Sequence, residues 1–572
     1  MADDMASDRG RSGSSDRRLI DEANRKALER DPVSTTRRES EWKQTSDIPK
    51  SVAEIRKALQ EKMGLDVSFD VIYREMTVGG RDAAVLVLNG FVNDVTVATV
   101  LHRLSLAREE DLRPSVLQTV VRELIPHAQV EVTSDFDEAV DAALVGQLVL
   151  FLSHEEKAVL VDTRKYPARS VDEPDLERVV RGSRDGFVET LLTNVTLVRR
   201  RLRDPRLTFE VMRVGERTKT HIAVGYIRDI ADPDLVRAIK RRIAEVKVDG
   251  LPVAEKQLEE SLIRQSWNPF PNVRYSERPD VVCAHLLEGH VIVFVDTSPS
   301  VMMLPSTYFH HLQHAEEYRQ SPFIGTYLRW VRYFGVLVSL FLLPLWFLVV
   351  HMPVKPEGLE FLGPAKPGKV PLLLQFVLIE LGIDLMRMAA VHTPSPLTTA
   401  MGLVAAILIG EIAVKTGLFN NEVILMMSVA AVGMFATPSY ELSLGNRIVR
   451  LSLLLAAGFF GACGFVVAAA VWLTFLATRR SYGSPYLWPF IPFNFRALVD
   501  VLLRRPVRFQ GDRPSVTRPV DPSRQKPSDC DKPPICDKVL RKTDFGRGEI
   551  LCGCAGQAGS TSGGILKSAA AT

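Results

Sequence analysis

The side chains with most potential for chemistry are three charged residues inside an apolar segment. Glu380, Asp384 and Arg387 lie between Pro371 and Val391, a stretch otherwise rich in aliphatic residues. Their i, i+4 and i+7 spacing places all three on one face of a helix. Charges at membrane depth normally face a bundle interior or water, because exposing them to lipid costs several kcal/mol. This face is therefore expected to line an aqueous path for cations or to lie at a helix or subunit interface.

The alternative for this face is a self-neutralising cluster that pins helices together, since Arg387 can pair with one of the two carboxylates. A second charged pair lies in the next apolar segment, where Glu411 precedes Lys415 by one helical turn. Side chains at i and i+4 can pair within their own helix, so a structural pair is favoured over an ion contact at Glu411.

Three histidines precede the first apolar segment, at His310, His311 and His314. The spacing of His310 and His314 suits one helical face, as a zinc site would need. The neighbouring glutamates do not complete a His-Glu-x-x-His motif, so a surface helix close to the membrane is the simpler interpretation.

Six cysteines are spread along the chain, and four of them lie in the C-terminal tail, at positions 530, 536, 552 and 554. Their spacing is irregular and does not match a zinc knuckle. No nucleophile with an adjacent base is visible elsewhere. The sequence therefore predicts no catalytic residue, no metal and no cofactor, and the protein is not expected to be an enzyme.

Two polar motifs stand out before the apolar region, in the stretches 181–187 and 275–280. Their charged residues are Arg181, Arg184, Asp185, Glu277, Arg278 and Asp280. The first stretch suits an anion-binding turn before a helix, although it lacks the Gly-Lys-Ser/Thr ending of a P-loop. Arg and Asp at turns more often tie packed elements together or form subunit contacts, and that interpretation is favoured.

Five strongly apolar segments must position the membrane charges. They cover residues 330–350, 371–391, 397–416, 423–444 and 451–476. A bilayer crossing takes about 20 mostly apolar residues in a helix, because every backbone polar group must be bonded internally. At least four segments reach that length. The sequence predicts α+β cytoplasmic domains followed by an α-helical transmembrane domain of four to five membrane helices.

The flanking charges conflict with an odd number of crossings. Arg329 and Arg332 lie at the start of the first segment, and further arginines from Arg479 onward follow the last. Positive charge marks the cytoplasmic side, so both ends are expected there. The number of crossings is even if one segment does not span the membrane, and the charged second segment is the candidate. The positions of Arg447 and Arg450 fit this topology poorly.

The remaining chain divides by composition. Residues 1–47 are charged and poor in apolar side chains, so they are expected to be disordered and to contain no signal peptide. Two soluble α+β subdomains are expected at 48–173 and 174–318, a membrane domain at 319–480, a basic juxtamembrane segment at 481–511 and a disordered tail at 512–572. No internal repeat is visible. The net charge of +3, from 71 basic and 68 acidic residues, excludes a concentrated nucleic-acid footprint.

Secondary structure in the soluble part follows from hydrophobic periodicity and turn residues. Helices are expected at 48–63, 95–107, 115–124, 136–144, 186–201 and 233–246. Strands are expected at 67–76, 83–88, 129–133, 147–153, 158–163, 207–214, 221–227, 281–286 and 290–296. In the membrane segments, small residues favour close helix packing and oligomerisation, at Gly402, Ala406 and Gly410 and again at Gly458, Gly461, Ala462 and Gly464.

The sequence resembles the A-subunit family of bacterial spore germinant receptors, and most closely its stage V sporulation protein AF branch. The resemblance runs from about Asp66 to Arg504. It rests on the 181–187 motif, on Ser276-Glu-Arg-Pro-Asp280, on the prolines at 485, 489 and 492, and on Phe435-Ala-Thr-Pro-Ser-Tyr-Glu-Leu442. Family members commonly have Thr in place of Ser276 and often Glu in place of Met388.

This resemblance implies a multi-pass protein of the inner spore membrane, with its soluble domains on the cytoplasmic side. It implies a homo-oligomer, as a pentamer, that acts as an ion channel or channel subunit and releases monovalent cations during germination together with a small membrane partner protein. A non-conducting receptor or scaffold subunit that binds a germinant or partner proteins is the alternative.

Overall fold

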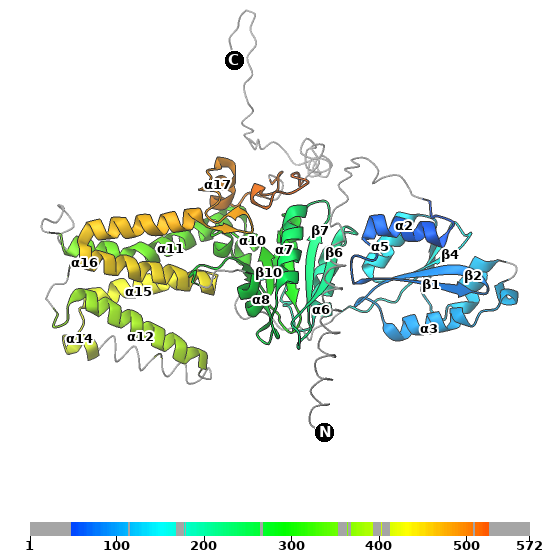
Figure 1. Cartoon of the computed structure of the whole chain (residues 1–572), viewed down its shortest axis with the longest axis horizontal. Helices are drawn as coiled ribbons and strands as arrows, with labels where there is room; N and C mark the ends of the chain where they lie inside the picture. Colours follow the sequence, from blue (N-terminus) through cyan, green and yellow to red (C-terminus); the bar gives the residue numbers. More distant parts are fainter. Residues whose placement is uncertain are drawn as a thin grey trace, which may run out of the picture. The chain divides into compact units, whose positions relative to one another are not determined.

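The structure is a computed structural model that describes residues 47–112, 115–166, 177, 179–262, 267–352, 363, 368–392, 402, 412–506 and 510–524. These residues form two five-stranded sheets, each covered by helices, and a group of long apolar helices (Figure 1).

The first sheet is antiparallel, with strand order β1-β2-β4-β5-β3. Its strands are β1 Val71–Val78, β2 Arg81–Leu88, β3 Val130–Thr133, β4 Leu148–Leu152 and β5 Ala158–Val161. Helices α2 (Val52–Met63) and α5 (Phe136–Val145) cover one face, and α3 (Asp94–Ser105), α4 (Val116–Thr119) and a π-helical turn (Val120–Leu124) cover the other. Strand β2 is buried on both faces, which explains its uninterrupted apolar run.

Local turn chemistry in this sheet agrees with the sequence. Val78 pairs with Arg81, so Gly79 and Gly80 form a two-residue hairpin turn with φ values of 53° and 79°. Such turns need positive φ at both central positions, which glycine adopts without a steric cost. The predicted end of the first helix at residue 63 is also confirmed, because Gly64 caps α2 in the left-handed conformation.

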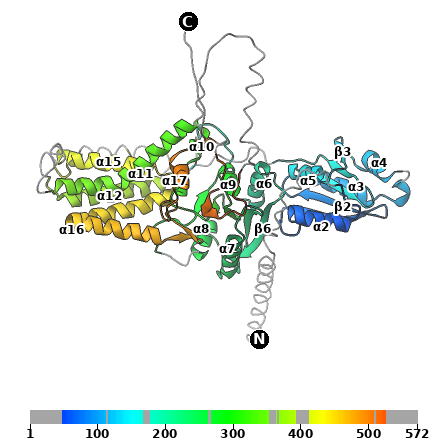
Figure 2. The same ribbon diagram turned by 90° about the horizontal axis from the view of Figure 1, so that it is seen from above.

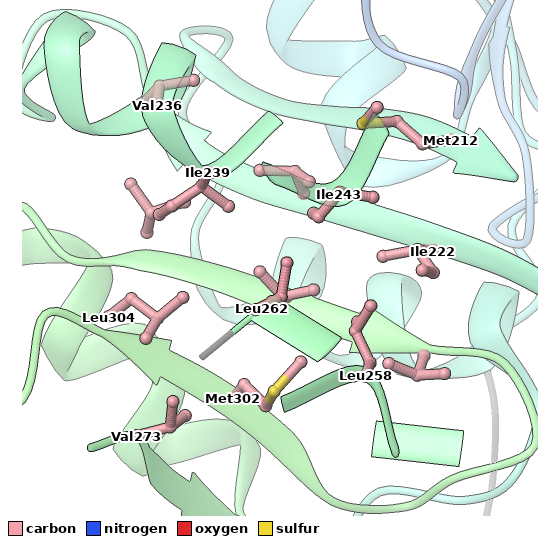
Figure 3. Close-up of a cluster of buried hydrophobic side chains, with 14 of the residues drawn as sticks. Met212, Ile222, Val236, Ile239, Ile243, Leu258, Leu262, Val273, Met302 and Leu304 are labelled. Atoms are coloured by element: carbon pink, nitrogen blue, oxygen red, sulfur yellow. The ribbon is translucent and has the colours of Figure 1, made fainter. Parts of the chain in front are cut away.

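The second sheet has strand order β6-β7-β9-β10-β8. Its strands are β6 Leu207–Val214, β7 Thr220–Ile227, β8 Arg274–Ser276, β9 Val291–Val295 and β10 Val301–Leu304. Helices α7 (Pro233–Glu245) and α8 (Ala254–Leu262) pack on one face, where Figure 3 shows Ile239, Ile243 and Leu258 among the sheet residues. Helices α6 (Leu191–Arg201) and α9 (Pro279–Leu287) pack on the other.

The two modules repeat one topology. Each runs helix, two strands, two helices, strand, helix, two strands, and each sheet has the same strand order with the first and last helices on one face. The prediction of no internal repeat is therefore wrong at the level of structure. The repeat lies in the order of elements and in burial, which many different apolar residues satisfy, so it leaves no sequence signature visible by inspection.

Several element predictions need correction. The segment 281–286, predicted as a strand with Cys283 in it, belongs to helix α9. A short apolar run does not distinguish a buried helix from a strand, and Pro279 in the first turn suits a helix start. Helix α8 and strands β8 and β10 were not predicted, and α6 begins at Leu191, five residues later than expected.

A buried ion pair joins the two modules. The Arg199 guanidinium on α6 donates to both carboxylate oxygens of Asp70, at 3.0 and 3.1 Å, and also to the Leu207 carbonyl at 2.9 Å. The two side chains are 1% and 3% exposed. Such a pair is strongly destabilising to break, because either partner alone would be a buried uncompensated charge.

The apolar helices follow the second module, and both views show four of them side by side (Figure 1, Figure 2). They are α11 Pro322–Val350, α12 Leu372–His392, α15 Asn421–Phe435 and α16 Tyr440–Thr478, with the short helix α14 (Ala413–Lys415) before α15. Among the described residues, α11 and α16 are long and apolar enough to cross a membrane, with mean hydropathies of 2.4 and 2.3. Most of the predicted third segment, 397–416, lies outside the described residues.

The last two predicted segments are divided differently in the structure. The segment 423–444 is interrupted, because α15 ends at Phe435 and Ser439 caps the start of α16 by accepting from the Leu442 amide at 3.3 Å. Thr437 and Pro438 separate the two helices, and a proline favours extended backbone in the residue before it.

Helix α16 consists of two arms that fold back on each other at Gly461. This residue has φ 64° and ψ −150°, and the Trp472 indole donates to the Ser452 hydroxyl at 2.7 Å. In a straight helix these two residues would lie about 30 Å apart. The arms run over 440–460 and 462–478, so the last apolar region makes a helical hairpin. Gly458 packs on Leu373 and Gly464 on the Ala456 carbonyl of the same chain, so these small residues already serve intramolecular packing.

The hairpin changes the direction in which the chain leaves the apolar helices. Its second arm returns toward the start of α16, as the hydrogen bond from Trp472 to Ser452 shows. The start of α11 also meets the chain after α16, because the Arg329 guanidinium donates to the Asp500 and Val501 carbonyls, both at 3.0 Å. Both carbonyls belong to the last turn of helix α17 (Phe495–Leu502). Both arginine-rich flanks therefore lie at the same end of the helices.

The beginning of the predicted disordered tail is ordered. Residues 510–524 lie against the second module, where the Val520 amide donates to the Ile230 carbonyl at 2.9 Å and the Thr517 hydroxyl to the Glu288 carbonyl at 2.7 Å. Backbone bonding and the buried Val516 hold this segment despite its polar composition. The remainder of the tail, from 525, and residues 1–46 lie outside the described residues.

We predict that Gly461→Val destabilises the folded helix group by about 1 to 3 kcal/mol, because a residue with a Cβ does not adopt this φ/ψ region without strain. Thermal unfolding of the detergent-solubilised protein would measure the change. Ala462→Val, one residue along on an exposed helical position, is the matched control and should unfold close to wild type. Equal unfolding temperatures for both variants would contradict the hairpin.

Candidate functional site

The charged face of α12 is held by two arginines of α16. Glu380 is 3% exposed and accepts from Arg450 Nε at 2.7 Å and from Arg447 Nε at 3.1 Å. Arg447 also donates to the Glu380 carbonyl at 2.7 Å, and Arg450 donates to the Ser339 carbonyl of α11 at 3.1 Å. One buried carboxylate therefore connects three helices.

The other two predicted residues of this face lie in different surroundings. Asp384 forms an ion pair with Arg447, yet its side chain remains 39% exposed. Arg387 pairs with neither carboxylate. Its guanidinium lies 5.8 Å from the Phe435 ring centre and 5.6 Å from that of Tyr440, and its Nη1 is buried without a hydrogen-bond partner among the described residues.

A charge cluster does hold helices together, but the carboxylates of α12 pair with other arginines than the one expected. Glu380 and Asp384 are balanced by Arg447 and Arg450, and the expected pairing with Arg387 is wrong. The signal was present in the sequence, because Arg447 and Arg450 are three residues apart and share a helix face. Glu411, the fourth predicted membrane residue, lies outside the described residues.

Helices α11 and α15 cross closely next to this charge cluster. A Cβ added to Gly433 would lie 2.3 Å from the Gly335 carbonyl oxygen, so the two backbones touch at this point. Close backbone approach at glycine is the usual means of packing membrane helices, because lipid supplies little hydrophobic drive between them. The crossing lies one turn before Ser339, whose carbonyl accepts the hydrogen bond from Arg450.

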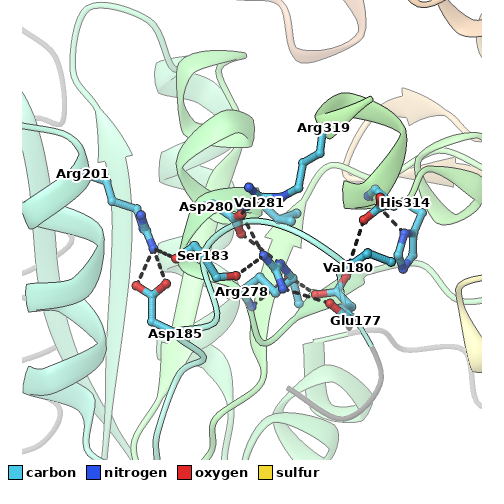
Figure 4. Close-up of polar contacts among 12 residues, drawn as sticks. Glu177, Val180, Ser183, Asp185, Arg201, Arg278, Asp280, Val281, His314 and Arg319 are labelled. Carbon is cyan, nitrogen blue, oxygen red and sulfur yellow. Dashed lines mark hydrogen bonds and ion pairs between the residues drawn. The ribbon is translucent and has the colours of Figure 1, made fainter. Parts of the chain in front are cut away.

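The soluble motif centres on Arg278, which is fully buried (Figure 4). Its guanidinium donates to Asp280 at 3.0 and 3.1 Å, to the Glu177 carbonyl at 3.0 Å and to the Ser183 carbonyl at 2.9 Å. The two hydrogen bonds to the Glu177 and Ser183 carbonyls tie the segment before α6 to the start of α9. This is the interpretation in which Arg and Asp at turns hold packed elements together.

The acidic residues of the motif are paired on either side of Arg278. Asp280 also binds Arg319, and Asp185 binds Arg201 of α6 (Figure 4). Burial by itself would raise the pKa of Asp280, but the two guanidiniums keep the pKa of this carboxyl below its usual value. The Asp280 carboxylate is therefore charged and engaged at neutral pH.

The remaining motif residues are less involved in the contacts around Arg278. The Glu277 carbonyl accepts from the Phe187 amide at 2.8 Å and its side chain from the Ser300 hydroxyl at 3.3 Å, whereas Arg181 and Arg184 are exposed. The structure therefore brings Asp185, Glu277, Arg278 and Asp280 together and leaves the two other arginines at the surface. Asp185 and Asp280 line a surface cleft with Arg200 and Arg203.

Three histidines gather beneath the second sheet, but they are not the three that the sequence singled out. The His285 and His290 ring centres lie 4.8 Å apart, and those of His290 and His310 lie 5.1 Å apart. His285 also lies 3.3 Å from Arg274 Nη1. His310 and His311 are buried, so the expected surface helix is wrong; they lie in a 3-10 turn instead. No metal-binding group of three or more ligands occurs in the described ranges.

Comparison with known proteins gives a consistent result. A family model described as Bacillus/Clostridium GerA spore germination protein matches residues 57–516. Stage V sporulation protein AF of Bacillus subtilis is 47% identical over 467 residues, which cover 82% of this chain and 95% of that protein. Spore germination protein KA of B. subtilis is 27% identical over 84% of this chain and 88% of its own length.

A third relative and one solved structure extend the comparison. Spore germination protein GerLA of Bacillus cereus is 28% identical over 83% of this chain and 97% of that protein. The crystal structure of the N-terminal domain of the A subunit of the Bacillus megaterium spore germinant receptor GerK3 is 23% identical, covers 46% of this chain and 98% of that chain, and has a TM-score of 0.37.

We predict strong coupling between Glu380 and Arg450. Glu380→Leu and Arg450→Met should each lower the unfolding free energy by about 3 to 5 kcal/mol, because the first leaves Arg450 without a carboxylate and the second leaves Glu380 with Arg447 alone. The double variant should cost clearly less than the sum, since it removes both charges. Unfolding in detergent measures the cycle, Asp384→Asn serves as a half-exposed control, and strictly additive losses would contradict the coupling.

We also predict that acid destabilises the soluble part through its buried histidines. Burial, followed by the charge of Arg274, lowers the pKa of His290 to about 4, and burial and the same arginine lower that of His311 to about 3. Unfolded histidines titrate near 6.5, so below that pH the unfolded chain binds more protons and stability falls as pH falls to about 4.

Thermal unfolding between pH 7.5 and 4.5 would measure this loss. His290→Asn should flatten the dependence on pH, whereas His102→Asn, at an exposed position on α3, should leave it unchanged. An identical slope in wild type and in the His290 variant would contradict the assignment.

Proposed function

The chain belongs to the Bacillus/Clostridium GerA family of spore germination proteins, and from this membership we propose that it is a multi-pass subunit of an ion channel in the inner spore membrane. In this proposal it releases monovalent cations during germination, with its soluble modules on the cytoplasmic side. The matched region includes both modules and the apolar helices, so the proposal concerns the whole described architecture.

One observation carries the proposal. Contacts within the chain bury Glu380 on the charged face of α12 but leave Asp384 partly accessible. Glu380 is enclosed by Arg447 and Arg450, so its role in one chain is to fix the rotation of α12. With that rotation fixed, Asp384 lies on the same face one turn along, and its side chain is 39% exposed although it pairs with Arg447. Repeated around an oligomer axis, such carboxylates form an acidic ring, which is a known basis for cation preference.

The other surfaces of the helices support an oligomer. Large apolar side chains along α12 are exposed, among them Leu374, Leu378, Leu381 and Leu385. Exposed apolar helix faces require lipid or another protein surface to cover them. We propose a homo-oligomer, as a pentamer, joined by a small membrane partner protein, because the family resemblance implies both.

A non-conducting receptor or scaffold subunit is the second candidate. The observation in its favour is the neutral balance of the α12 cluster, where two carboxylates face two arginines. In that case the cluster only anchors helices, and the surface cleft lined by Asp185, Arg200 and Asp280 would take a ligand or partner.

The deciding experiment is ion flux from liposomes that contain the purified protein, alone and with the small membrane partner. We expect wild type to pass K⁺ in preference to Cl⁻. Asp384→Asn should reduce that preference several-fold while assembly size is unchanged, because the ring loses its negative charge. Asp94→Asn, an exposed acid on α3, is the matched control.

Equal selectivity in wild type and Asp384→Asn would remove Asp384 from the pathway. Absence of flux in both preparations, from protein that is correctly assembled, would favour the receptor or scaffold function.

A further inference from the structure

A cleft between the second module and the end of α16 concentrates positive charge. It has a volume of about 730 Å³ and is lined by Arg241 and Arg242 of α7, together with Arg479 and Arg480, which directly follow α16. Glu245 is the acidic side chain in the lining. Four guanidiniums against one carboxylate leave a local excess of three positive charges.

Two of the four arginines are open to solvent. In the part of the chain that the structure describes, Arg241 and Arg480 are exposed and form no ion pair. The Arg242 guanidinium lies 4.8 Å from the centre of the Tyr482 ring, and the Arg479 guanidinium 4.3 Å from that of Phe475. An aromatic contact orients a guanidinium without removing its charge.

The position of the cleft identifies the source of the anion. Arg479 follows Thr478, the last residue of a helix that is apolar enough to span a membrane, so the cleft lies where that helix leaves the hydrocarbon. Phosphates of lipid headgroups lie at this depth, and basic pockets on the cytoplasmic side bind anionic headgroups. Guanidinium groups match phosphate oxygens in a bidentate geometry.

We propose that this arginine cleft, formed by Arg241, Arg242, Arg479 and Arg480, binds the phosphate of an anionic phospholipid headgroup. Bound there, the lipid connects α7 of the soluble module to the end of the membrane hairpin. The inference uses the membrane placement of α16 but does not depend on ion conduction, so it can fail or hold independently of the channel function.

The test is native mass spectrometry of the full-length protein in detergent, titrated with dihexanoyl phosphatidylglycerol. Separate titrations use dihexanoyl phosphatidylcholine and inorganic phosphate. The test variant is Arg241→Gln with Arg480→Gln. The control is Arg81→Gln with Arg103→Gln, which removes the same charge from exposed positions of the first module. A third protein, with Arg241→Lys and Arg480→Lys, keeps the charge but loses the bidentate geometry.

We expect phosphatidylglycerol to bind wild type and the control pair equally, and the glutamine pair at least about tenfold more weakly, with the lysine pair between them. Phosphatidylcholine should bind weakly to all four proteins. Equal affinity of phosphatidylglycerol for wild type and the glutamine pair would overturn the site. Inorganic phosphate that binds as tightly as phosphatidylglycerol, with the same loss, would overturn the lipid assignment in favour of a soluble phosphate ligand.

Discussion

The interaction on which the membrane part depends is the ionic contact of Glu380 with Arg447 and Arg450. In an apolar medium an isolated charge is costly, so each of these residues requires the others. The contact includes the Ser339 carbonyl and so joins α11, α12 and α16. It fixes how α12 is rotated, and that rotation decides which residues of α12 remain available to ions, lipid or a neighbouring subunit.

The same principle operates in the soluble modules with different partners. Arg199 with Asp70 joins the two sheets, Lys240 with Glu210 lies inside the second core, and Arg278 with Asp280 secures the segment before α6. Arg329 with Glu317 continues the series to the first residues of α11. Buried pairs of this kind contribute little net stability but penalise any arrangement that separates them. A chain of such contacts therefore favours one arrangement of elements from the first sheet to the membrane helices.

The fold also explains how one chain forms two separate charged sites, the arginine cleft at the end of α16 and the charged face of α12. The hairpin at Gly461 returns the chain to the end where α11 begins, so arginines from positions far apart in sequence meet there. Arg241 and Arg480 are 239 positions apart (480 minus 241), yet they line one cleft. That cleft and the charged face of α12 belong to the same molecule but involve separate residues, so variants of one can be examined without altering the other.

The sequence by itself determined the elements whose signals are local. Period-2 and period-3.6 hydrophobicity located most strands and helices of both modules, and the motifs identified the family. It also placed Glu380 and Asp384 on one helix face. Only the tertiary structure decided their partners, because pairing depends on which helices pack together and not on spacing within one helix. The repeat of the two modules, the helical character of 281–286 and the reversal at Gly461 were likewise decided by packing, since apolar composition satisfies helix, strand and hairpin alike.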